Sequence, residues 1–373
     1  MQNLRSGGAN ARVEFRQNLR APRTNEMGAL TGADPKKNKQ DRKEELPKSS
    51  RKARVRWRGV IPAVTTPFNA DLSVDYGALA DQCRWLAERG VSGIAPLGSL
   101  GEGATLTHSE KRQILETCVR AVGDRVAVLP GVFALSTPEA VALARHARAV
   151  GCGGLMILPP FIYGADAREV QTYVGVVMAA TDLRCILYNN PQAYRVDFLP
   201  EQVALLAREF PNLEAVRESS PDPQRLTALR AALDSRVEIL GGSDSTILEA
   251  FAEGAVGWLS GLVSAFPAEC LALHRHAVES KVDLDASGEH PMQKLAELHQ
   301  WFAPLMQLTT GPKVIQHTKL IQERVGRGHS RVRAPRLALE GEELRRALEI
   351  IDHAIATRPK LDEAPATVAS KEA

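Results

Sequence analysis

The chain has 373 residues, 44% of them hydrophobic and 24% charged, so it can bury one large core. The net charge of +3 hides a split, because residues 1–56 hold 15 Lys and Arg against 6 Asp and Glu, which leaves the remainder acidic. No run approaches the roughly 20 apolar residues that cross a bilayer, and the start lacks the apolar core of a secretory signal. We therefore expect a soluble cytoplasmic protein without a membrane or nucleic-acid partner, since the globular part shows no basic patch interleaved with aromatic residues.

The five cysteines, at positions 83, 118, 152, 185 and 270, lie far apart inside apolar patterns. They lack the short paired spacing of metal sites, so we predict buried free thiols in a reducing compartment. No G-x-G-x-x-G turn follows the first apolar run, which argues against a dinucleotide site. The sequence thus predicts neither a cofactor nor a bound metal.

Residues 1–56 are rich in Arg, Lys, Asn, Gly, Pro and Ser and show no sustained hydrophobic period. Such a segment cannot bury enough apolar area to offset chain entropy, so we expect a disordered basic tail. A transit peptide or a nucleic-acid arm are alternatives, and Met27 could equally be the true start. Residues 358–373 are expected to form a second disordered tail.

From Trp57 onward, eight short apolar runs alternate with amphipathic segments of helix length. The runs span residues 60–66, 93–98, 126–132, 154–159, 184–190, 213–219, 237–242 and 257–262. Continuous apolar runs indicate strands covered on both faces, as in a parallel sheet. Eight strands, each followed by a helix, predict a closed (β/α)8 TIM barrel over residues 57–262, and residues 263–357 predict a C-terminal helical cap.

Three helix starts can be located from their first residues. Thr107 with Glu110, and Ser136 with Glu139, have the spacing of capping boxes, in which hydroxyl and carboxylate each bind a free backbone N–H. Asp222 opens a third helix.

In a barrel of this kind, the active site lies at the carboxyl ends of the strands. The polar residues where the apolar runs end are Thr65, Thr66, Ser99, Gly101, Glu102, Tyr188, Asn189, Arg217, Glu218, Ser219, Gly242, Ser243, Asp244, Ser260 and Gly261. From these strand ends we take Thr65, Ser99, Gly101, Gly242, Ser243 and Ser260 as candidate substrate-binding residues, to which the resemblance described below adds Leu100. The Gly98–Glu102 segment precedes a helix, so its N–H groups could hold a carboxylate, or it could be only a tight turn.

Tyr188, Arg217 and Ser99 are the candidate catalytic residues. Tyr188 could relay protons if Ser99 activates its hydroxyl, although most strand tyrosines only pack. Arg217 ends a buried run, and a guanidinium is seldom buried without a partner. We expect it to pair with Glu218 or another acid, or to receive a substrate carboxylate.

Five segments resemble the dihydrodipicolinate synthase and N-acetylneuraminate lyase family, in family order. They are GVIPAVTTPF (59–68), PLGSLGEGATLT (96–107), LYNNP (187–191), VRESSPD (216–222) and GWLSGL (257–262), and the resemblance covers roughly residues 57–357. Within the family, GSLGE, YNNP, GWLSGL followed by AFP, and RAPRLALEGEE (333–343) look most like the branch that includes 1-pyrroline-4-hydroxy-2-carboxylate deaminase.

The resemblance implies a homotetramer built from dimers, in which a lysine on the sixth strand condenses with a 2-oxo acid. It also implies that Tyr188 shuttles protons and that Ser99, Leu100 and Gly101 hold the carboxylate. Arg217 stands where the family has that lysine. A second departure is Phe161-Ile162, where synthases often place a tyrosine pair that completes a neighbouring subunit's proton relay; Tyr163 is adjacent.

A guanidinium stays protonated, so Arg217 cannot attack a ketone to form an iminium. No lysine occurs between Lys111 and Lys281, and we expect Lys313 and Lys319 to be surface or packing residues of the cap. Aldol chemistry on pyruvate is therefore not expected. The favoured hypothesis is a lyase or deaminase that acts on a small 2-oxo or cyclic imino acid, with 1-pyrroline-4-hydroxy-2-carboxylate as the candidate substrate. The alternatives are a barrel that binds a 2-oxo acid as a sensor or partner subunit, and a Schiff-base aldolase or synthase.

Overall fold

The computed structural model describes residues 55, 57–161, 163–220, 222, 224–279 and 291–361. All eight expected strands are present within shorter bounds, and the third is split in two. They are β1 (Gly59–Pro62), β2 (Gly93–Ile94), β3 (Ala127–Val128), β4 (Gly131–Val132), β5 (Leu155–Ile157), β6 (Cys185–Asn189), β7 (Leu213–Glu218), β8 (Glu238–Gly241) and β9 (Gly257–Ser260).

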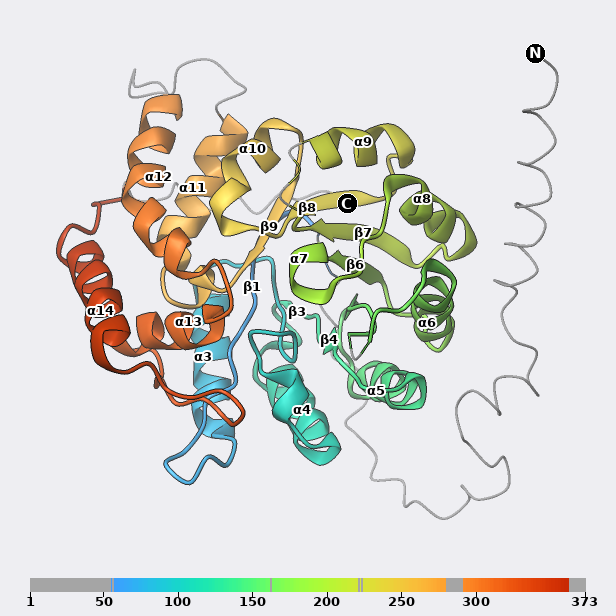
Figure 1. Cartoon of the computed structure of the whole chain (residues 1–373), viewed down its shortest axis with the longest axis horizontal. Coiled ribbons are helices and arrows are strands. Elements are labelled where there is room, and N and C mark those ends of the chain that lie inside the picture. The colour runs from blue at the N-terminus through green and yellow to red at the C-terminus, as the bar shows by residue number, and fades with distance from the viewer. Residues whose placement is uncertain are drawn as a thin grey trace.

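The strands form a closed parallel barrel, as the sequence predicts. Seven of them pair in the order β1-β9-β8-β7-β6-β5-β4, and β2 pairs with β3. A parallel bridge between Ala63 and Ala95 joins the end of β1 to that of β2 and completes the ring. Figure 1 shows helices outside the strands, which is the (β/α)8 arrangement.

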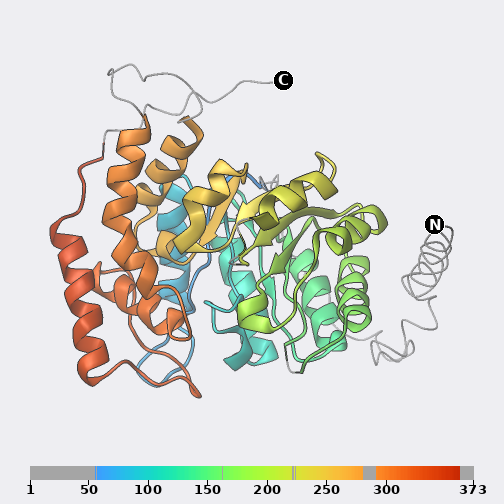
Figure 2. The ribbon, with the colours of Figure 1, turned by 45° about the horizontal axis from the view of Figure 1, so that its top comes forward.

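Helices follow the strands around the barrel. They are α3 (Tyr76–Glu88), α4 (His108–Val122), α5 (Thr137–Val150), α6 (Ala167–Ala179), α7 (Pro191–Tyr194), α8 (Pro200–Glu209), α9 (Gln224–Ala232) and α10 (Ile247–Ala252). The chain continues into α11 (Pro267–Glu279), α12 (Pro291–Leu308), α13 (Val314–Arg324) and α14 (Gly341–Ala356). Figures 1 and 2 show α12, α13 and α14 gathered at one side of the molecule, away from α6 and α8.

The helix starts agree with the sequence except at one carboxylate. Thr107 caps α4 in a complete capping box with Glu110. Ser136 accepts from the N–H of Glu139, but the second half of the expected box is wrong, because the Glu139 carboxylate instead binds Lys111 Nζ at 2.7 Å and the N–H of Leu135. A buried lysine competes for that carboxylate more strongly than a neutral N–H does.

Two apolar layers surround the strands. Alternate strand residues such as Val60 point outward to the helices, while neighbours such as Ile61 fill the barrel interior, where Leu129 and Met156 join them. The five cysteines are all buried and form no disulfide, as predicted. The interior is therefore a packed core, which leaves only the barrel's ends for a site.

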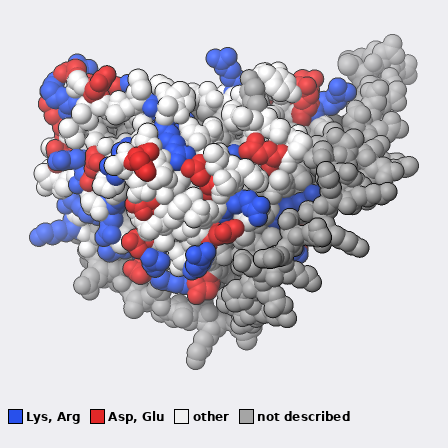
Figure 3. Space-filling view, turned by 90° about the horizontal axis from the view of Figure 1, so that it is seen from below, with Lys and Arg blue, Asp and Glu red and all other residues white. Residues whose placement is uncertain are grey.

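The expected tails lie outside the described residues except at their inner ends. Val55 is buried against the barrel, and Arg358 forms an ion pair with Glu269. In the described part of the chain, no helix is long and apolar enough to cross a membrane. The face seen in Figure 3 carries acidic and basic side chains next to one another.

Candidate active site

A cavity of about 610 Å3 opens at the carboxyl ends of the strands, and we call it the strand-end cavity. Parallel strands end at one rim, so residues far apart in sequence meet there. Eight of the nine predicted site residues line it: Ser99, Leu100, Gly101, Tyr188, Arg217, Gly242, Ser243 and Ser260. These residues come from the ends of five apolar runs, which thus do converge, as the barrel hypothesis requires.

Thr65 is the ninth, and it is a correction to the predicted binding set. Its side chain is buried and is not among those lining the cavity. The Thr65 hydroxyl donates to Gln322 Oε1 at 2.7 Å, on α13 of the cap. This hydroxyl therefore joins barrel to cap and is not directed at a ligand.

Arg217 is buried at the end of β7 and is held by carbonyl oxygens alone. Its Nε and Nη2 donate to the Leu259 carbonyl at 3.3 and 3.0 Å, and Nη2 also donates to the Gly242 carbonyl at 2.7 Å. Among the described residues, no carboxylate forms an ion pair with it. Carbonyl oxygens satisfy N–H groups without cancelling the charge, so the guanidinium keeps a positive charge that no ion pair with a described carboxylate neutralises.

Pairing of Arg217 with Glu218, one of the alternatives that the sequence left open, is therefore not the one that the structure shows. Successive residues of a strand point to opposite faces, which sends the two side chains apart. Glu218 accepts instead from Asn189 Nδ2 at 2.9 Å and from the N–H of Ser220 at 2.6 Å. Burial raises the pKa of the Glu218 carboxyl, against these hydrogen bonds.

Tyr188 lies beside Arg217, as the strand register dictates. The Arg217 Cζ is 4.1 Å from the centre of the tyrosine ring, a cation–π contact. The Tyr188 hydroxyl accepts from Asn190 Nδ2 at 3.0 Å, which leaves its own proton free to be donated. The expected hydrogen bond from Ser99 is absent from this part of the structure, because Ser99 lies near Tyr194 instead.

Tyr194 is a site residue that the sequence analysis missed. Asn190 and Pro191 start the one-turn helix α7, whose last residue, Tyr194, packs edge-on against Tyr188 with ring centres 5.7 Å apart. Its buried hydroxyl has no hydrogen-bond partner. Burial raises the pKa of Tyr194, as does Tyr188, while Ser99 and two arginines, Arg217 and Arg336, oppose that rise. The Asn-Pro pair was the available signal.

A buried ion pair joins the loop after β2 to α13 of the cap. Glu102 adopts a left-handed conformation at φ 53°, and its carboxylate binds Lys319 of α13 and the N–H of Arg333. Both paired side chains are at most 1% exposed, so of the two positions expected for Lys319, surface or packing, the structure shows the buried one. Burial lowers the pKa of Lys319 to about 8, with Glu102 opposing the shift.

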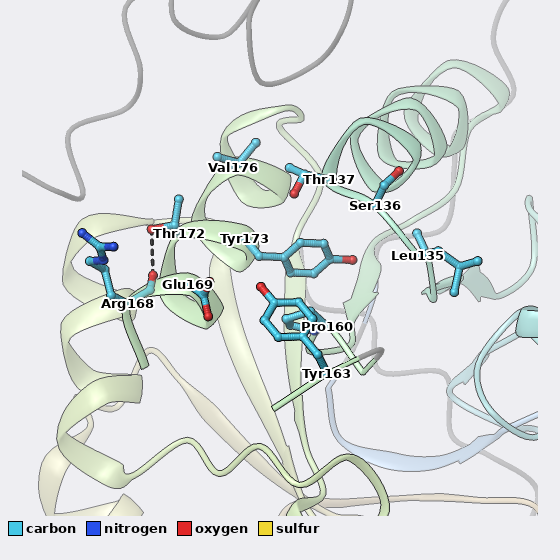
Figure 4. A pocket seen from close by; sticks show the side chains of 11 residues that line it. Leu135, Ser136, Thr137, Pro160, Tyr163, Arg168, Glu169, Thr172, Tyr173 and Val176 are labelled. Atoms are coloured by element: carbon cyan, nitrogen blue, oxygen red, sulfur yellow. Dashed lines mark hydrogen bonds between the residues drawn. The ribbon is translucent and has the colours of Figure 1, made fainter. Parts of the chain in front are cut away.

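The segment after β5 bears on the predicted relay. Phe161 stacks on Phe133 with ring centres 4.1 Å apart, and Ile162 lies outside the described residues. Tyr163 is 56% exposed and lines a separate pocket of about 510 Å3 with Leu135 and Tyr173, which we call the α5–α6 pocket (Figure 4). The strand-end cavity therefore takes Phe133, but not Tyr163, from this region.

The cap supplies part of the cavity wall. Thr309 and Arg336 line it, and neither was predicted. Asp244 accepts from Trp258 Nε1 at 3.0 Å and from the Thr309 hydroxyl at 2.9 Å, which joins the end of β8 to the cap. Burial raises the pKa of Asp244, against these hydrogen bonds and the charge of Arg217.

Residues 56–354 match the model of the dihydrodipicolinate synthetase family. Because the match spans most of the chain and the barrel with its cap has the family's fold, this chain belongs to that family, whose members are lyases and aldolases.

Several characterised relatives share most of their length with it. The chain is 30% identical to a 4-hydroxy-tetrahydrodipicolinate synthase of Methanocaldococcus jannaschii, over 79% of this chain and 96% of the relative. A synthase of the same name from Chelativorans sp. is 35% identical over 57% of this chain and 73% of its own. The crystal structure of dihydrodipicolinate synthase from Aquifex aeolicus matches with a TM-score of 0.74 at 27% identity, covering 79% of this chain and 97% of that one.

Proposed function

We propose that this chain is a lyase acting on a small 2-oxo or cyclic imino acid without forming a Schiff base. The favoured substrate is 4-hydroxy-1-pyrroline-2-carboxylate, which would give 2-oxoglutarate semialdehyde and ammonia. The observation that carries the proposal is Arg217, a permanent cation at the cavity wall that has no lone pair for a ketone. No lysine is among the described residues that line this cavity.

The pyrroline already contains the C=N bond that an enzyme lysine would otherwise create. Its protonated imine accepts the electron pair when C3 loses a proton, and the C4 hydroxyl then leaves as water. Addition of two waters to the product opens the ring and releases ammonia, so one water is consumed overall. Arg217 would bind the carboxylate or stabilise the developing charge. Tyr188, whose proton is free, would act as acid or base.

The decisive experiment is an ammonia-release assay on the pyrroline, with the natural protein and with Arg217→Lys. We expect ammonia from the natural protein in equal amount to the semialdehyde. Arg236→Lys is the matched control, because Arg236 also donates to backbone carbonyls but is not among the cavity-lining residues. If only Arg217→Lys releases ammonia, the proposal is wrong and the natural chain is a disabled enzyme.

A second candidate is a barrel that binds a 2-oxo acid without turnover, as a sensor or partner subunit. The uncompensated charge of Arg217 supports binding of an anion equally well. This candidate predicts a higher melting temperature with a 2-oxo acid and no product from any substrate tested.

We also propose that the protein is a homotetramer and that it is located in the cytoplasm.

A further inference from the structure

Two guanidinium groups line the strand-end cavity, from opposite parts of the chain. Arg217 comes from β7, and Arg336 from the segment between α13 and α14. That segment is held against the barrel by Arg331, whose Nε donates to the Phe68 carbonyl at 2.8 Å, and by Arg333, which binds Glu110. The contacts of Arg331 and Arg333 thus fix the position of Arg336 in the chain.

Arg336 has one ion-pair partner among the described residues, the carboxylate of Glu102. The nearest carboxylate oxygen, on Glu102, is 3.9 Å from Nη1 and is too distant for a hydrogen bond. Glu102 is already bound to Lys319 and to the N–H of Arg333. The charge of Glu102 is therefore matched by the buried lysine, and that of Arg336 remains available to a ligand.

Asp244 is the one acidic side chain among the residues lining the cavity. Its two oxygens accept from Trp258 and Thr309, so it serves a structural link. Two cations against one engaged carboxylate leave the lining with a positive charge. Such a cavity favours an anionic ligand, and its electrostatic interactions are stronger than in bulk water.

Among the described residues, two buried hydroxyls at the cavity have no hydrogen-bond partner within normal geometry. Tyr194 is 9% exposed and Ser219 is 6% exposed, and both line the cavity. Ser219 lies beside Arg217, since a methyl group placed on Gly242 would meet both side chains. Tyr194 lies near Ser99 and within electrostatic reach of both guanidiniums. Buried polar atoms are almost always hydrogen-bonded, so the Ser219 hydroxyl indicates an oxygen atom of a ligand. The Tyr194 hydroxyl, beside Ser99, can donate to a second ligand oxygen.

We propose that the strand-end cavity binds a small dicarboxylate of four or five carbons. One carboxylate binds Arg217 with Ser219, and the other binds Arg336 with Tyr194. A volume of about 610 Å3 accommodates such a compound with water. The inference goes beyond the proposed function, because it states which acids the cavity binds and not which one reacts.

The test compares two acids of equal chain length by isothermal titration calorimetry. 2-Oxoglutarate carries a second carboxylate where 2-oxopentanoate has a methyl group. We expect 2-oxoglutarate to bind the natural protein at least about tenfold more tightly, the size of one charge-assisted contact. Arg336→Gln should remove this preference, because it should weaken the binding of 2-oxoglutarate more than that of 2-oxopentanoate, and Arg336→Lys should keep part of it.

Arg346→Gln is the matched control, because it removes the same charge from an exposed pair on α14. It should keep the full preference. Equal affinity for the two acids, no binding of either, or a preference that survives in Arg336→Gln overturns the inference. If the preference is present but no ammonia is released from the pyrroline, the proposed function alone fails. Ammonia release without the preference defeats this inference alone.

Discussion

Gly242 provides the space in which Arg217 lies. A Cβ at position 242 would be 2.0 Å from Ser219 Oγ and 2.9 Å from Arg217 Cγ, so even alanine must displace the guanidinium. We expect Gly242→Ala to weaken binding of 2-oxopentanoate about tenfold or more, measured by calorimetry. Gly164→Ala is the control, because nothing lies within 4 Å of a Cβ there. Unchanged affinity in Gly242→Ala would show that Arg217 does not contact the ligand.

Lys319 is a buried lysine whose amine contacts Glu102 of the loop after β2. Although burial lowers its pKa to about 8, it is bound to Glu102 and to the Arg331 carbonyl and does not line the cavity. We predict that pyruvate and borohydride leave the mass of the natural protein unchanged. Intact-protein mass spectrometry measures this. A pyruvyl adduct on any residue would support the aldolase alternative.

Arg333 sets the acid response of the start of α4. It lowers the pKa of Glu110 from 4.5 to about 2. Because the folded-state pKa is depressed, the stabilisation is present above pH 4.5 and is lost as the pH falls toward 2. Arg333→Gln should therefore lower the free energy of unfolding at pH 7 and flatten its decline between pH 4.5 and 2. Urea titrations at several pH values measure both, with Arg346→Gln expected to leave the decline unchanged.

At the scale of elements, α13 and the loop after β2 are joined by Lys319 and Glu102. Removing the lysine leaves a buried carboxylate without its cation, which typically costs about 3–5 kcal/mol. Lys319→Met should lower the free energy of unfolding by about that amount, and adding Glu102→Gln should restore part of it. Lys313→Met, which breaks an exposed pair with Glu343, should cost less than about 1 kcal/mol. Equal losses in the two single variants would contradict this account.

Local patterns predicted the elements well where each segment decides its own conformation. The apolar runs gave every strand, because burial on both faces requires a continuous apolar sequence. The pattern failed where a distant side chain intervenes, as at Glu139, whose carboxylate is taken by Lys111. It also passed over α7, since one turn of helix has no period to detect.

At the scale of the whole molecule, the barrel hypothesis predicted that the strand ends meet, and eight of the nine predicted site residues do line one cavity. The contribution of the cap could not be found in that way. Arg336 and Thr309 reach the cavity only through the packing of α12 to α14 against the barrel, and no motif spacing records that contact. Thr65 was misassigned for the same reason, because its partner Gln322 is on the cap.

Assembly is a second property of the whole molecule. Leu135 is 59% exposed and Tyr163 is 56% exposed, and both line the α5–α6 pocket (Figure 4). Apolar side chains gathered at one place favour contact with another chain. We expect light scattering to show a tetramer for the natural protein and a smaller species for Leu135→Asp. Leu337→Asp, at an equally apolar but separate exposed position, should remain tetrameric. A monomeric natural protein would refute the proposed assembly.

Replacing Arg217 would leave the carbonyl oxygens that now accept its hydrogen bonds without their donor. Leu259 lies on β9 and Gly242 follows β8, so the guanidinium of Arg217 on β7 links the ends of three neighbouring strands. An ammonium group has tetrahedral donors on one nitrogen. It could not contact these carbonyl oxygens and a substrate carbon at the same time. A lysine at position 217 that attacks a substrate would therefore lose the hydrogen bonds that now join these strand ends.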